Sequence, residues 1–363
     1  MKWKLEKIEI EGFKSIRATR LTLSTLNLMI GANGAGKSNF IAAFALLNQI
    51  VEGHLQSHIA RKGGSTAFLH NGPKHTKAIR LKLDFGKNAY EAKLEFGQDD
   101  APFFATEDCY FHDPNFPRPY SEHLGSGQKE SQLRLAAKGI RVAKYALDAM
   151  QSWTVYHFHD TSDEAAIKRK GPIDDNDTLR RDASNLAAFL YRLRKTETNS
   201  YKRIVGATRQ VAPFFDDFRL RPDRLRKDEI QLEWTQRDSD AYLNAHAFSD
   251  GALRFICLAT LLLQPEPPSL ILIDEPELGL HPYAIHQLAA LFRSASKRTQ
   301  ILVATQSVTL MNQFEPQNII VVDRGEGQST FRRIEEKEIE TWTDSYALGD
   351  LWEKAVLGGR PKR

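Results

Sequence analysis

Residues Gly31 to Ser38 read "GANGAGKS", and this stretch decides how the rest of the chain is interpreted. It fits the pattern G-x-x-x-x-G-K-[ST], in which backbone N–H groups wrap a phosphate, the lysine reaches the β- and γ-phosphates, and the hydroxyl ligates Mg²⁺. The apolar run "LNLMI" precedes it and a run with helical periodicity, "NFIAAFALLNQIV", follows it. Because the mechanism needs this loop between a strand and a helix, we predict a site for a nucleoside triphosphate.

We also predict that Lys37 is catalytic and that Ser38 is a metal ligand. The predicted triphosphate contacts form one continuous segment: Gly31, Ala32, Asn33, Gly34, Ala35, Gly36, Lys37, Ser38 and Asn39.

A second motif, "SLILIDEPELGLHP" at residues 269–282, is an apolar strand that ends in two adjacent acids. This is the Walker B arrangement. We predict that Asp274 holds Mg²⁺ and that Glu275 orients or deprotonates the attacking water. A solvent-exposed pair of acids at a strand end is the alternative.

Composition sets wide bounds on function. The chain has 363 residues, 41% hydrophobic and 26% charged, with a formal net charge of +4, so global charge neither demands nor excludes a nucleic-acid partner. Its two cysteines, Cys109 and Cys257, have no metal-type spacing, which favours a reducing compartment and small core residues. The start of the chain lacks a signal segment, and the most apolar windows are too short to span a bilayer. We therefore expect a cytoplasmic protein without membrane contact.

Hydrophobic patterning predicts an α/β chain. "LEKIEIEGF" and "ATRLTLSTLNLMI" are typical of strands, and residues 78–112 alternate like an antiparallel meander. Residues 112–128 are rich in Pro and Gly and predict a loop, whereas 129–151 and about 182–211 predict helices, and "EIQLEW" a strand. In the last third, helices alternate with continuous apolar strands, which indicates a sheet covered on both faces.

"FSDGALR" at residues 248–254 stands directly before the apolar run "FICLATLLL". Ser249 and Asp250 are good helix N-caps, which is the simpler interpretation. The same first-turn N–H groups and the positive end of the helix dipole also form an anion site. The anion that would bind there depends on the other motifs.

Together the three motifs resemble the ABC-type ATPase heads of the SMC and RecF class. "FSDGALR" then resembles their signature motif, with Asp250 where Gly is usual. The resemblance implies a P-loop NTPase fold with a mixed sheet, an antiparallel side sheet and a helical lobe. It also implies a head-to-tail homodimer with ATP sandwiched between subunits, in which Ser249, Asp250 and Gly251 bind the γ-phosphate held by the partner. By chain order we expect a P-loop lobe at 1–160, a helical basic lobe at 161–246 and a signature, Walker B and switch lobe at 247–363.

A narrower resemblance covers nearly the whole chain. "EGFKSI", "FHDTS", "DASNLAAFLYRL", "DEPELGLHP" and "LWEKAVLGGRP" are similar to short bacterial predicted AAA-type ATPases. These are related to the ATPase halves of OLD-type nucleases and of anti-phage defence systems. The resemblance is specific for ATPase class and much less so for biological role, because one fold hosts many functions.

Four positions are assigned by this resemblance, and two of them depart from its pattern. Gln306 stands where the class has a switch histidine; its amide donates hydrogen bonds but has no proton that titrates near neutral pH, so hydrolysis is expected to be slow. The class has a glutamine, in a segment called the Q-loop, where the chain leaves the side sheet, and this chain has none there. By chain order His159 takes that place and is the candidate metal ligand; the alternative is a histidine with a structural role. Lys14 is expected near the nucleotide or in solvent. His281 is expected to face the dimer partner or solvent.

Positive charge concentrates between residues 190 and 227, which contain eleven Lys or Arg side chains and only four Asp or Glu side chains. Such a patch attracts phosphate backbones, so duplex DNA is a predicted partner; a solvated helix face or a docking surface for an acidic protein is the alternative. The basic residues are Arg192, Arg194, Lys195, Lys202, Arg203, Arg209, Arg219, Arg221, Arg224, Arg226 and Lys227.

Two functions follow from these motifs. The first is an ATP hydrolase that acts as a switch for a DNA-linked effector in phage defence or genome maintenance. The second is an ATP-binding scaffold with negligible hydrolysis that restrains or assembles a separate effector. By the resemblance to OLD-type nucleases, the roughly 60 residues after Gln306 are too few for the extra catalytic domain that those proteins carry. We therefore expect any nuclease or toxin activity to belong to a partner protein.

Overall fold

The computed structural model describes residues 3–335 and 348–354. Its contacts divide the chain into two compact units. The first unit comprises Met1–Val155, Pro268–Leu272 and Gln300–Arg363, and the second comprises Tyr156–Pro267 and Ile273–Thr299. Each unit therefore combines stretches from more than one of the three lobes expected by chain order.

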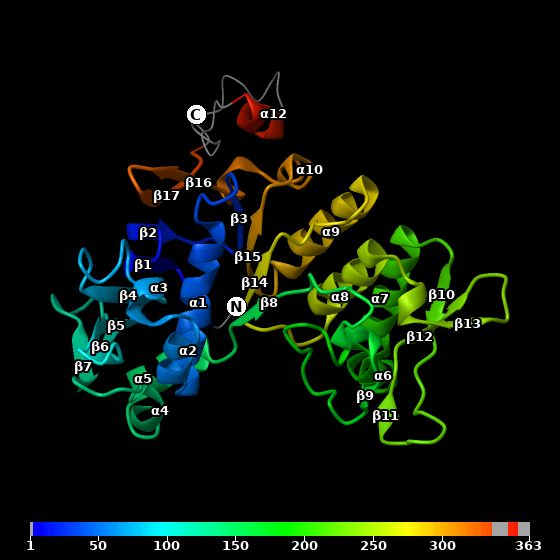
Figure 1. Ribbon diagram of the computed structural model, residues 1–363, viewed down its shortest axis with the longest axis horizontal. Helices are drawn as coiled ribbons and strands as arrows, with labels where there is room; N and C mark the ends of the chain where they lie inside the picture. Colours follow the sequence, from blue (N-terminus) through cyan, green and yellow to red (C-terminus); the bar gives the residue numbers. More distant parts are fainter. Residues whose placement is uncertain (1–2, 336–347, 355–363) are drawn as a thin grey trace. The chain divides into compact units, whose positions relative to one another are not determined.

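A mixed six-stranded sheet has the order β17-β16-β3-β15-β14-β8 (Figure 1). β3 pairs in parallel with both β15 and β16, and β16 pairs antiparallel with β17. Every residue of β3 and β15 is buried, as expected for strands covered on both faces. The strands are β3 (Leu26–Ile30), β8 (Thr154–Tyr156), β14 (Leu270–Asp274), β15 (Gln300–Thr305), β16 (Ile319–Gly325) and β17 (Gln328–Arg333).

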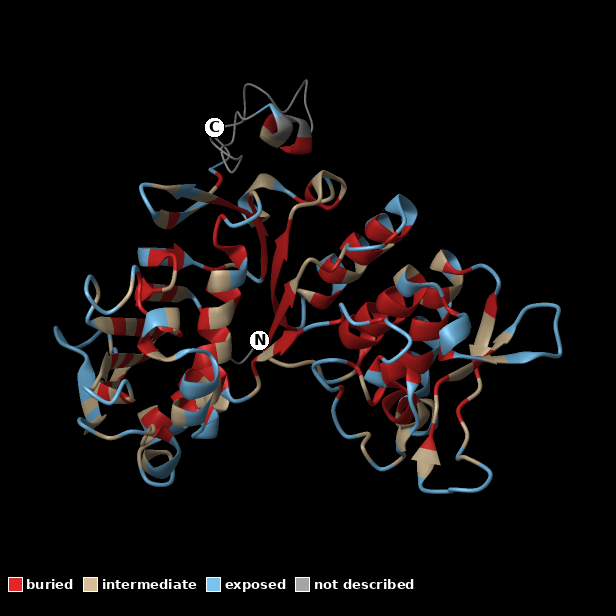
Figure 2. Ribbon diagram, viewed as in Figure 1, coloured by how far each residue is buried: buried red, intermediate tan, exposed pale blue. Residues whose placement is uncertain are grey.

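An antiparallel side sheet of six strands has the order β2-β1-β4-β5-β6-β7. Alternate residues of β4 and β5 are buried, which gives the banded strands of Figure 2. The predicted meander at 78–112 is confirmed as the centre of this sheet. Its strands are β1 (Lys7–Phe13), β2 (Ile16–Thr22), β4 (Ala78–Asp84), β5 (Asn88–Phe96), β6 (Pro102–Phe111) and β7 (Tyr120–Gly125).

The first unit also contains seven described α-helices, of which α5 and α2 contact strands of the side sheet. The longest, α1 (Lys37–Glu52), buries Phe40 and Phe44, and the Phe44 ring lies 5.5 Å from that of Trp153. The others are α2 (Leu55–Arg61), α3 (Gly64–Phe68), α4 (Leu133–Ala136), α5 (Arg141–Met150), α10 (Val308–Met311), the 3-10 turn η3 (Pro316–Asn318) and α12 (Leu348–Glu353).

The second unit is built around α8 (Asp250–Leu263), which is buried from Ala252 to its end, as a helix that is apolar on all sides should be. Two small sheets, β10-β12-β13 and β11-β9, complete the unit. The remaining elements are η1 (Ala166–Lys168), β9 (Gly171–Pro172), α6 (Leu186–Thr196), α7 (Thr198–Val211), β10 (Phe215–Phe218), β11 (Glu229–Ile230), β12 (Glu233–Gln236), β13 (Tyr242–Asn244), η2 (Ala245–Ala247) and α9 (Pro282–Ala295).

Several element predictions were wrong in detail. The run "ATRLTLSTLNLMI" is two strands in different sheets, because Ser24 N and Ser24 Oγ both bond to Asn27 Oδ1 and turn the chain. The helix predicted near 182–211 is interrupted at Glu197, and the one at 129–151 is broken by the turn around Gly139. Residues 112–128 are not only a loop, since β7 pairs there with β6. "EIQLEW" contributes to two sheets rather than to one strand.

Other predictions agree with the structure. Both cysteines are buried and unpaired core residues. Among the described residues, no helix combines the length and the apolar composition needed to cross a bilayer. Most of the C-terminal motif "LWEKAVLGGRP" lies outside the described residues.

Candidate functional site

The glycine-rich loop runs from the end of β3 to the start of α1 in the first unit (Figure 1). Gly34 and Gly36 have φ values of 74° and 121°, a region that side-chain-bearing residues avoid. A Cβ on Gly31 would run into the carbonyl of Val322 on β16, so the first glycine is required by packing as well. The pattern in the sequence therefore corresponds to a loop that only these glycines can form.

Lys37 lies inside this loop and is only 5% exposed. Its Nζ donates to the carbonyls of Gly31 at 2.6 Å and Ala32 at 3.1 Å. The N-cap of α1, Gly36, has no side chain to accept from the first-turn N–H groups, and Ser38 is exposed beside it. An ammonium group, an N-terminal helix turn and a hydroxyl at one place fit a bound phosphate chain and its Mg²⁺.

Ser15, Ser329 and Arg324, for which no role was predicted from the sequence, hold this loop together with Asn39. Ser329 on β17 donates to the Ala35 carbonyl at 2.5 Å, and its Oγ shares a hydrogen bond with Ser15 Oγ at 2.7 Å. Asn39 donates to the same Ser15 oxygen at 2.7 Å, and Arg324 donates to the Gly34 carbonyl at 3.2 Å. A residue nearly three hundred positions away has no local signal, so pairing of β16 with β17 is what identifies Ser329 and Arg324.

Lys14 has a left-handed backbone, with φ at 50°. Its N–H donates to the Phe68 carbonyl, its own carbonyl accepts from His70 Nδ1 at 2.7 Å, and its Nζ lies 5.6 Å from the centre of the Phe68 ring. Burial and the nearby Lys62 lower the pKa of the Lys14 ammonium. The structure thus gives Lys14 a structural role in the first unit, and its contact with nucleotide stays a prediction.

The two acids predicted to serve Mg²⁺ and water come at the end of β14, where the chain enters the second unit. Glu275 has φ at 44°, which is unusual for a residue with a side chain and is typical of functional sites. The described residues contain no group of three or more His, Cys, Asp or Glu side chains that would form a complete metal cage. The Asp274 carboxylate and the Ser38 hydroxyl are hard oxygen ligands of the kind that suits Mg²⁺, and their roles as metal ligands stay predictions.

The signature-like stretch begins α8 in the second unit. Ser249 is its N-cap, and its side chain accepts from Ala252 N at 3.3 Å. Asp250 lies in the first turn, and both residues are exposed. A Cβ on Gly251 would lie 2.3 Å from the carbonyl oxygen of Gly279, so α8 starts in direct contact with the loop that follows Glu275. The N-cap interpretation is confirmed, and one capping bond leaves this exposed helix start accessible to an anion.

Arg254, one turn into α8, belongs to the signature-like stretch, but no role was predicted for it from the sequence. It is only 8% exposed. Its guanidinium donates to the carbonyls of Phe158 at 2.9 Å and His159 at 3.0 Å, and also to that of Leu278. One buried side chain therefore ties three segments of the second unit together: "FHDTS", the signature helix and "ELGLHP".

The remaining candidates lie as follows. His159 is exposed, and its carbonyl rather than its ring is bound by Arg254. His281 is also exposed and caps α9, where its Nδ1 accepts from Tyr283 N at 3.2 Å. Gln306 follows β15 directly and is half-buried. The metal, partner and γ-phosphate roles of these three side chains stay predictions.

The basic segment is used largely for internal contacts. Arg192 donates to the carbonyls of Asn176 and Asp177, and Arg194 donates to that of Leu220. Further side chains pair with acids, as in Arg209 with Asp216, Arg221 with Glu233 and Arg226 with Glu229. The second unit as a whole carries 21 Lys or Arg and 21 Asp or Glu, so it is not a positively charged lobe.

The chain has the fold of a P-loop ABC-type ATPase head, with a glycine-rich loop between β3 and α1, buried parallel strands, an antiparallel side sheet and a capped helix at Ser249. The chain belongs to the AAA_21 family, described as "AAA domain, putative AbiEii toxin, Type IV TA system", which matches residues 26–312. The fold is similar to that of an Smc head solved with the C-winged helix domain of ScpA, with 17% identity over 92% of this chain and 99% of that one and a TM-score of 0.57. The Smc head with an extended coiled coil, solved with the C-terminal domain of ScpA from Pyrococcus furiosus, gives 16% identity, 94% and 98% coverage and a TM-score of 0.55.

The chain is also similar to the Old nuclease of Escherichia phage P2. It is 20% identical over 374 residues, which cover 93% of this chain and 62% of the relative. The chain thus spans less than two thirds of that protein's length. The predicted resemblance to SMC-type heads and to OLD-type ATPases is confirmed.

Proposed function

We propose that this protein is a Mg-ATP-dependent ATPase that dimerises head to tail and acts as a switch for a DNA-linked effector, in anti-phage defence or genome maintenance. The observation that carries the proposal is the junction of Gly251 with Gly279. It joins an exposed, N-capped helix start to the loop that follows Glu275. In the proposed dimer the helix start meets the partner's ATP, and this junction fixes its position relative to the Glu275 loop of its own subunit.

Each predicted residue then has a role in the proposed cycle. The loop from Gly31 to Asn39 holds the triphosphate, with Lys37 as its buried cation. Ser38 and Asp274 hold Mg²⁺, which neutralises phosphate charge when bound, and His159 is the candidate for the remaining metal-side position. Glu275 orients or deprotonates the attacking water.

The signature residues act on the other subunit. The first-turn N–H groups of α8, with Ser249, Asp250 and Gly251, receive the γ-phosphate of the partner's ATP. His281, exposed at the start of α9, faces the partner. Hydrolysis removes the γ-phosphate that bridges the subunits, so the dimer reopens.

A second function is favoured by one residue. Gln306 contacts the γ-phosphate in place of a histidine, and its amide does not titrate near neutral pH. In this alternative ATP is a structural ligand and the dimer is a lasting scaffold that restrains an effector. In both cases the effector is a separate protein, a nuclease or a toxin. A soluble cytoplasmic location suits a nucleic-acid-linked switch.

Steady-state phosphate release distinguishes the two functions. The wild-type protein and Glu275→Gln are assayed with Mg-ATP, with and without duplex DNA. The switch predicts turnover well above that of the variant, since the variant keeps the size of the side chain but loses its charge. Equal rates for the two proteins under every condition would favour the scaffold.

A further inference from the structure

A hollow of about 350 Å³ lies in the second unit, beside the exposed loop formed by residues 224–228. Its volume is at the lower end of the range for small-ligand sites. We call it the Tyr242 hollow. Its lining includes Lys170, Arg221, Arg224, Leu225, Glu233 and Tyr242.

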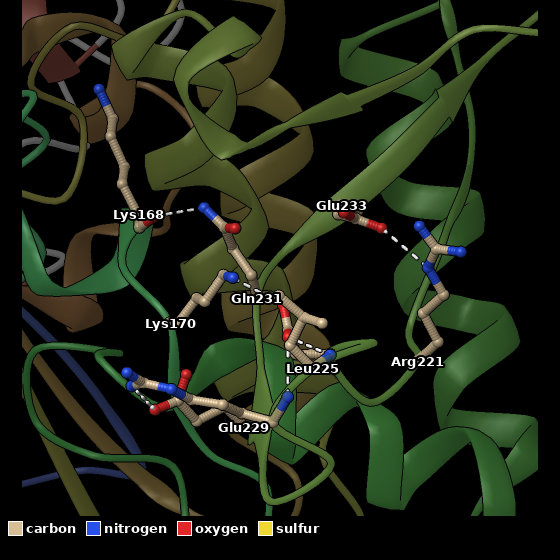
Figure 3. A network of polar contacts seen from close by, with 9 residues as sticks. Lys168, Lys170, Arg221, Leu225, Glu229, Gln231 and Glu233 are labelled. Carbon is tan, nitrogen blue, oxygen red and sulfur yellow. Dashed lines mark hydrogen bonds and ion pairs between the residues drawn. The ribbon is translucent and has the colours of Figure 1, made fainter.

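Ion pairs fix the walls of this hollow (Figure 3). Lys170 Nζ donates to Asp223 Oδ2 at 2.6 Å, and Arg221 Nε lies 3.3 Å from Glu233 Oε2. The other oxygen of Asp223 accepts from the backbone of Leu225 at 2.9 Å, so the loop is tied to the segment that carries Lys170. The Lys170 hydrogen bond, with these backbone donors, holds the pKa of the Asp223 carboxyl well below its usual value. The acids of the lining are therefore neutralised by its own cations.

One cation remains after this pairing. Arg224 is exposed and forms no hydrogen bond or ion pair with any residue in the described part of the chain. With Lys170 and Arg221 it gives the hollow three basic side chains against the two acids Asp223 and Glu233. The surplus positive charge suits an anionic ligand, and it stands at the rim, where a phosphate can reach it without a desolvation cost.

Flat groups form the other side of the hollow. The Tyr242 ring is 46% exposed, and the guanidinium carbons of Arg219 and Arg221 lie 4.1 and 5.2 Å from its centre. Leu225, beside them on the rim, is 93% exposed. Rings and guanidinium planes are the surfaces on which proteins stack unpaired bases, and adjacent cations hold the backbone of such a strand.

We propose that the Tyr242 hollow binds single-stranded nucleic acid, with a base stacked on the Tyr242–arginine group and phosphates held by Arg224 and its neighbours. A duplex keeps its base faces inside its own stack and could use only the charge. An acidic polypeptide would match the charge but offers no flat face to the ring. This inference rests on the nucleic-acid link of the proposed function and names the form of the ligand.

The position of the hollow connects it to the signature stretch within the same unit. Tyr242 begins β13, and Ser249 follows seven positions later. Between them Asn244 caps η2, accepting from His246 N at 3.1 Å, and Phe248 stacks on the buried Trp234 at 4.5 Å and 18°. A nucleic-acid strand bound at Tyr242 therefore contacts a short, well-packed segment of the chain that ends at Ser249, the N-cap of α8.

The test measures binding of a fluorescein-labelled oligothymidylate of about 12 nucleotides, within the usual footprint of single-strand sites, by anisotropy without ATP. Tyr242→Ala is expected to bind about ten- to hundredfold more weakly than wild type, because one stacked base is lost. Tyr242→Phe keeps the ring and is expected to bind like wild type. Arg224→Glu is expected to weaken binding and to reduce the salt slope by about 0.7 per lost phosphate contact.

Matched controls lie elsewhere on the chain. Lys297→Glu makes the same charge change at an exposed position after α9, outside the basic segment, and Phe116→Ala removes an exposed ring from the first unit; neither should alter binding. The proposal is overturned if Tyr242→Ala and Arg224→Glu bind like these controls. It is also overturned if a duplex of the same length binds better than the single strand, or if poly-glutamate competes as well as unlabelled oligothymidylate.

A second measurement addresses the connection to Ser249. Oligonucleotide affinity is compared with and without Mg-ATP in Glu275→Gln, and a difference that Tyr242→Ala removes supports the connection. Equal affinity in both states would overturn the connection. Since the first assay contains no ATP, failure of the ATPase proposal leaves its outcome unaffected, and failure of the hollow leaves the ATPase proposal standing.

Discussion

Replacing Gly251 by Ala tests the junction between α8 and the loop after Glu275. The new Cβ would lie 2.3 Å from the Gly279 carbonyl oxygen, whereas ordinary contacts begin at 3.4 Å, so the two backbones must separate by about 1 Å. Overpacking of this kind costs about 1–3 kcal/mol of unfolding free energy. A displacement of about 1 Å near reacting groups lowers turnover by up to about a hundredfold.

The matched control is Gly206→Ala. Gly206 lies inside α7 in the same unit, and a Cβ there meets nothing within 4 Å. This substitution should stabilise the protein by about 0.5–1 kcal/mol, because Ala is the better helix former. Urea unfolding, ATP calorimetry and phosphate release are measured on both variants.

We expect opposite shifts of the urea midpoint, unchanged ATP affinity at the P-loop in both variants, and reduced turnover only in Gly251→Ala. If Gly251→Ala is as stable and as active as Gly206→Ala, the proposed contact does not constrain the site, and the reasoning from it is wrong.

Other predictions concern single positions. Lys37→Ala should abolish ATP binding in calorimetry, since the triphosphate loses its buried cation; unchanged affinity would refute the P-loop assignment. Gln306→His should leave ATP affinity unchanged and alter turnover, and a variant that loses binding without a kinetic effect would show a structural role. Arg194→Glu should lower the urea midpoint, because the bond to the Leu220 carbonyl is lost, while Lys202→Glu should not. Burial raises the pKa of the Cys109 thiol to about 12 and also raises that of Cys257, so at about pH 8 both stay protonated and should react with a thiol reagent only after unfolding.

The sequence was most informative where function requires a fixed local pattern. The loop from Gly31 to Ser38 and the capped start of α8 at Ser249 are each defined by a few consecutive residues, whose backbone requirements can be predicted directly. The antiparallel meander at 78–112 was equally accessible, because alternate burial along a strand appears as alternate polarity.

Contacts between distant segments could not be predicted in this way. Ser329 supports the P-loop only because β17 pairs with β16, which lies beside β3. Arg254 is an ordinary basic residue until the carbonyls of His159 and Leu278 are brought to it. A side chain whose partners are far away in sequence carries no local pattern that identifies it.

The basic segment shows what a count of charges leaves out. Counting charges between 190 and 227 does not show which side chains already bind other groups of the chain. Arg192 and Arg194 hold backbone carbonyls, Arg219 and Arg221 lie half-buried against the Tyr242 ring, and Arg224 is exposed. Whether the protein binds duplex DNA or a single strand therefore depends on the few arginines beside Tyr242.

Mixing two inactive variants tests the two-subunit site most directly. Ser249→Arg keeps its P-loop but blocks the helix start, and Lys37→Ala keeps its helix start but does not bind ATP. A mixed dimer has one complete composite site. We predict that each variant alone neither hydrolyses ATP nor dimerises in light scattering with Mg-ATP, and that the mixture recovers dimers and up to about half the wild-type rate per dimer. Full activity of Ser249→Arg on its own would contradict the account, because the signature stretch would then be only a capped helix.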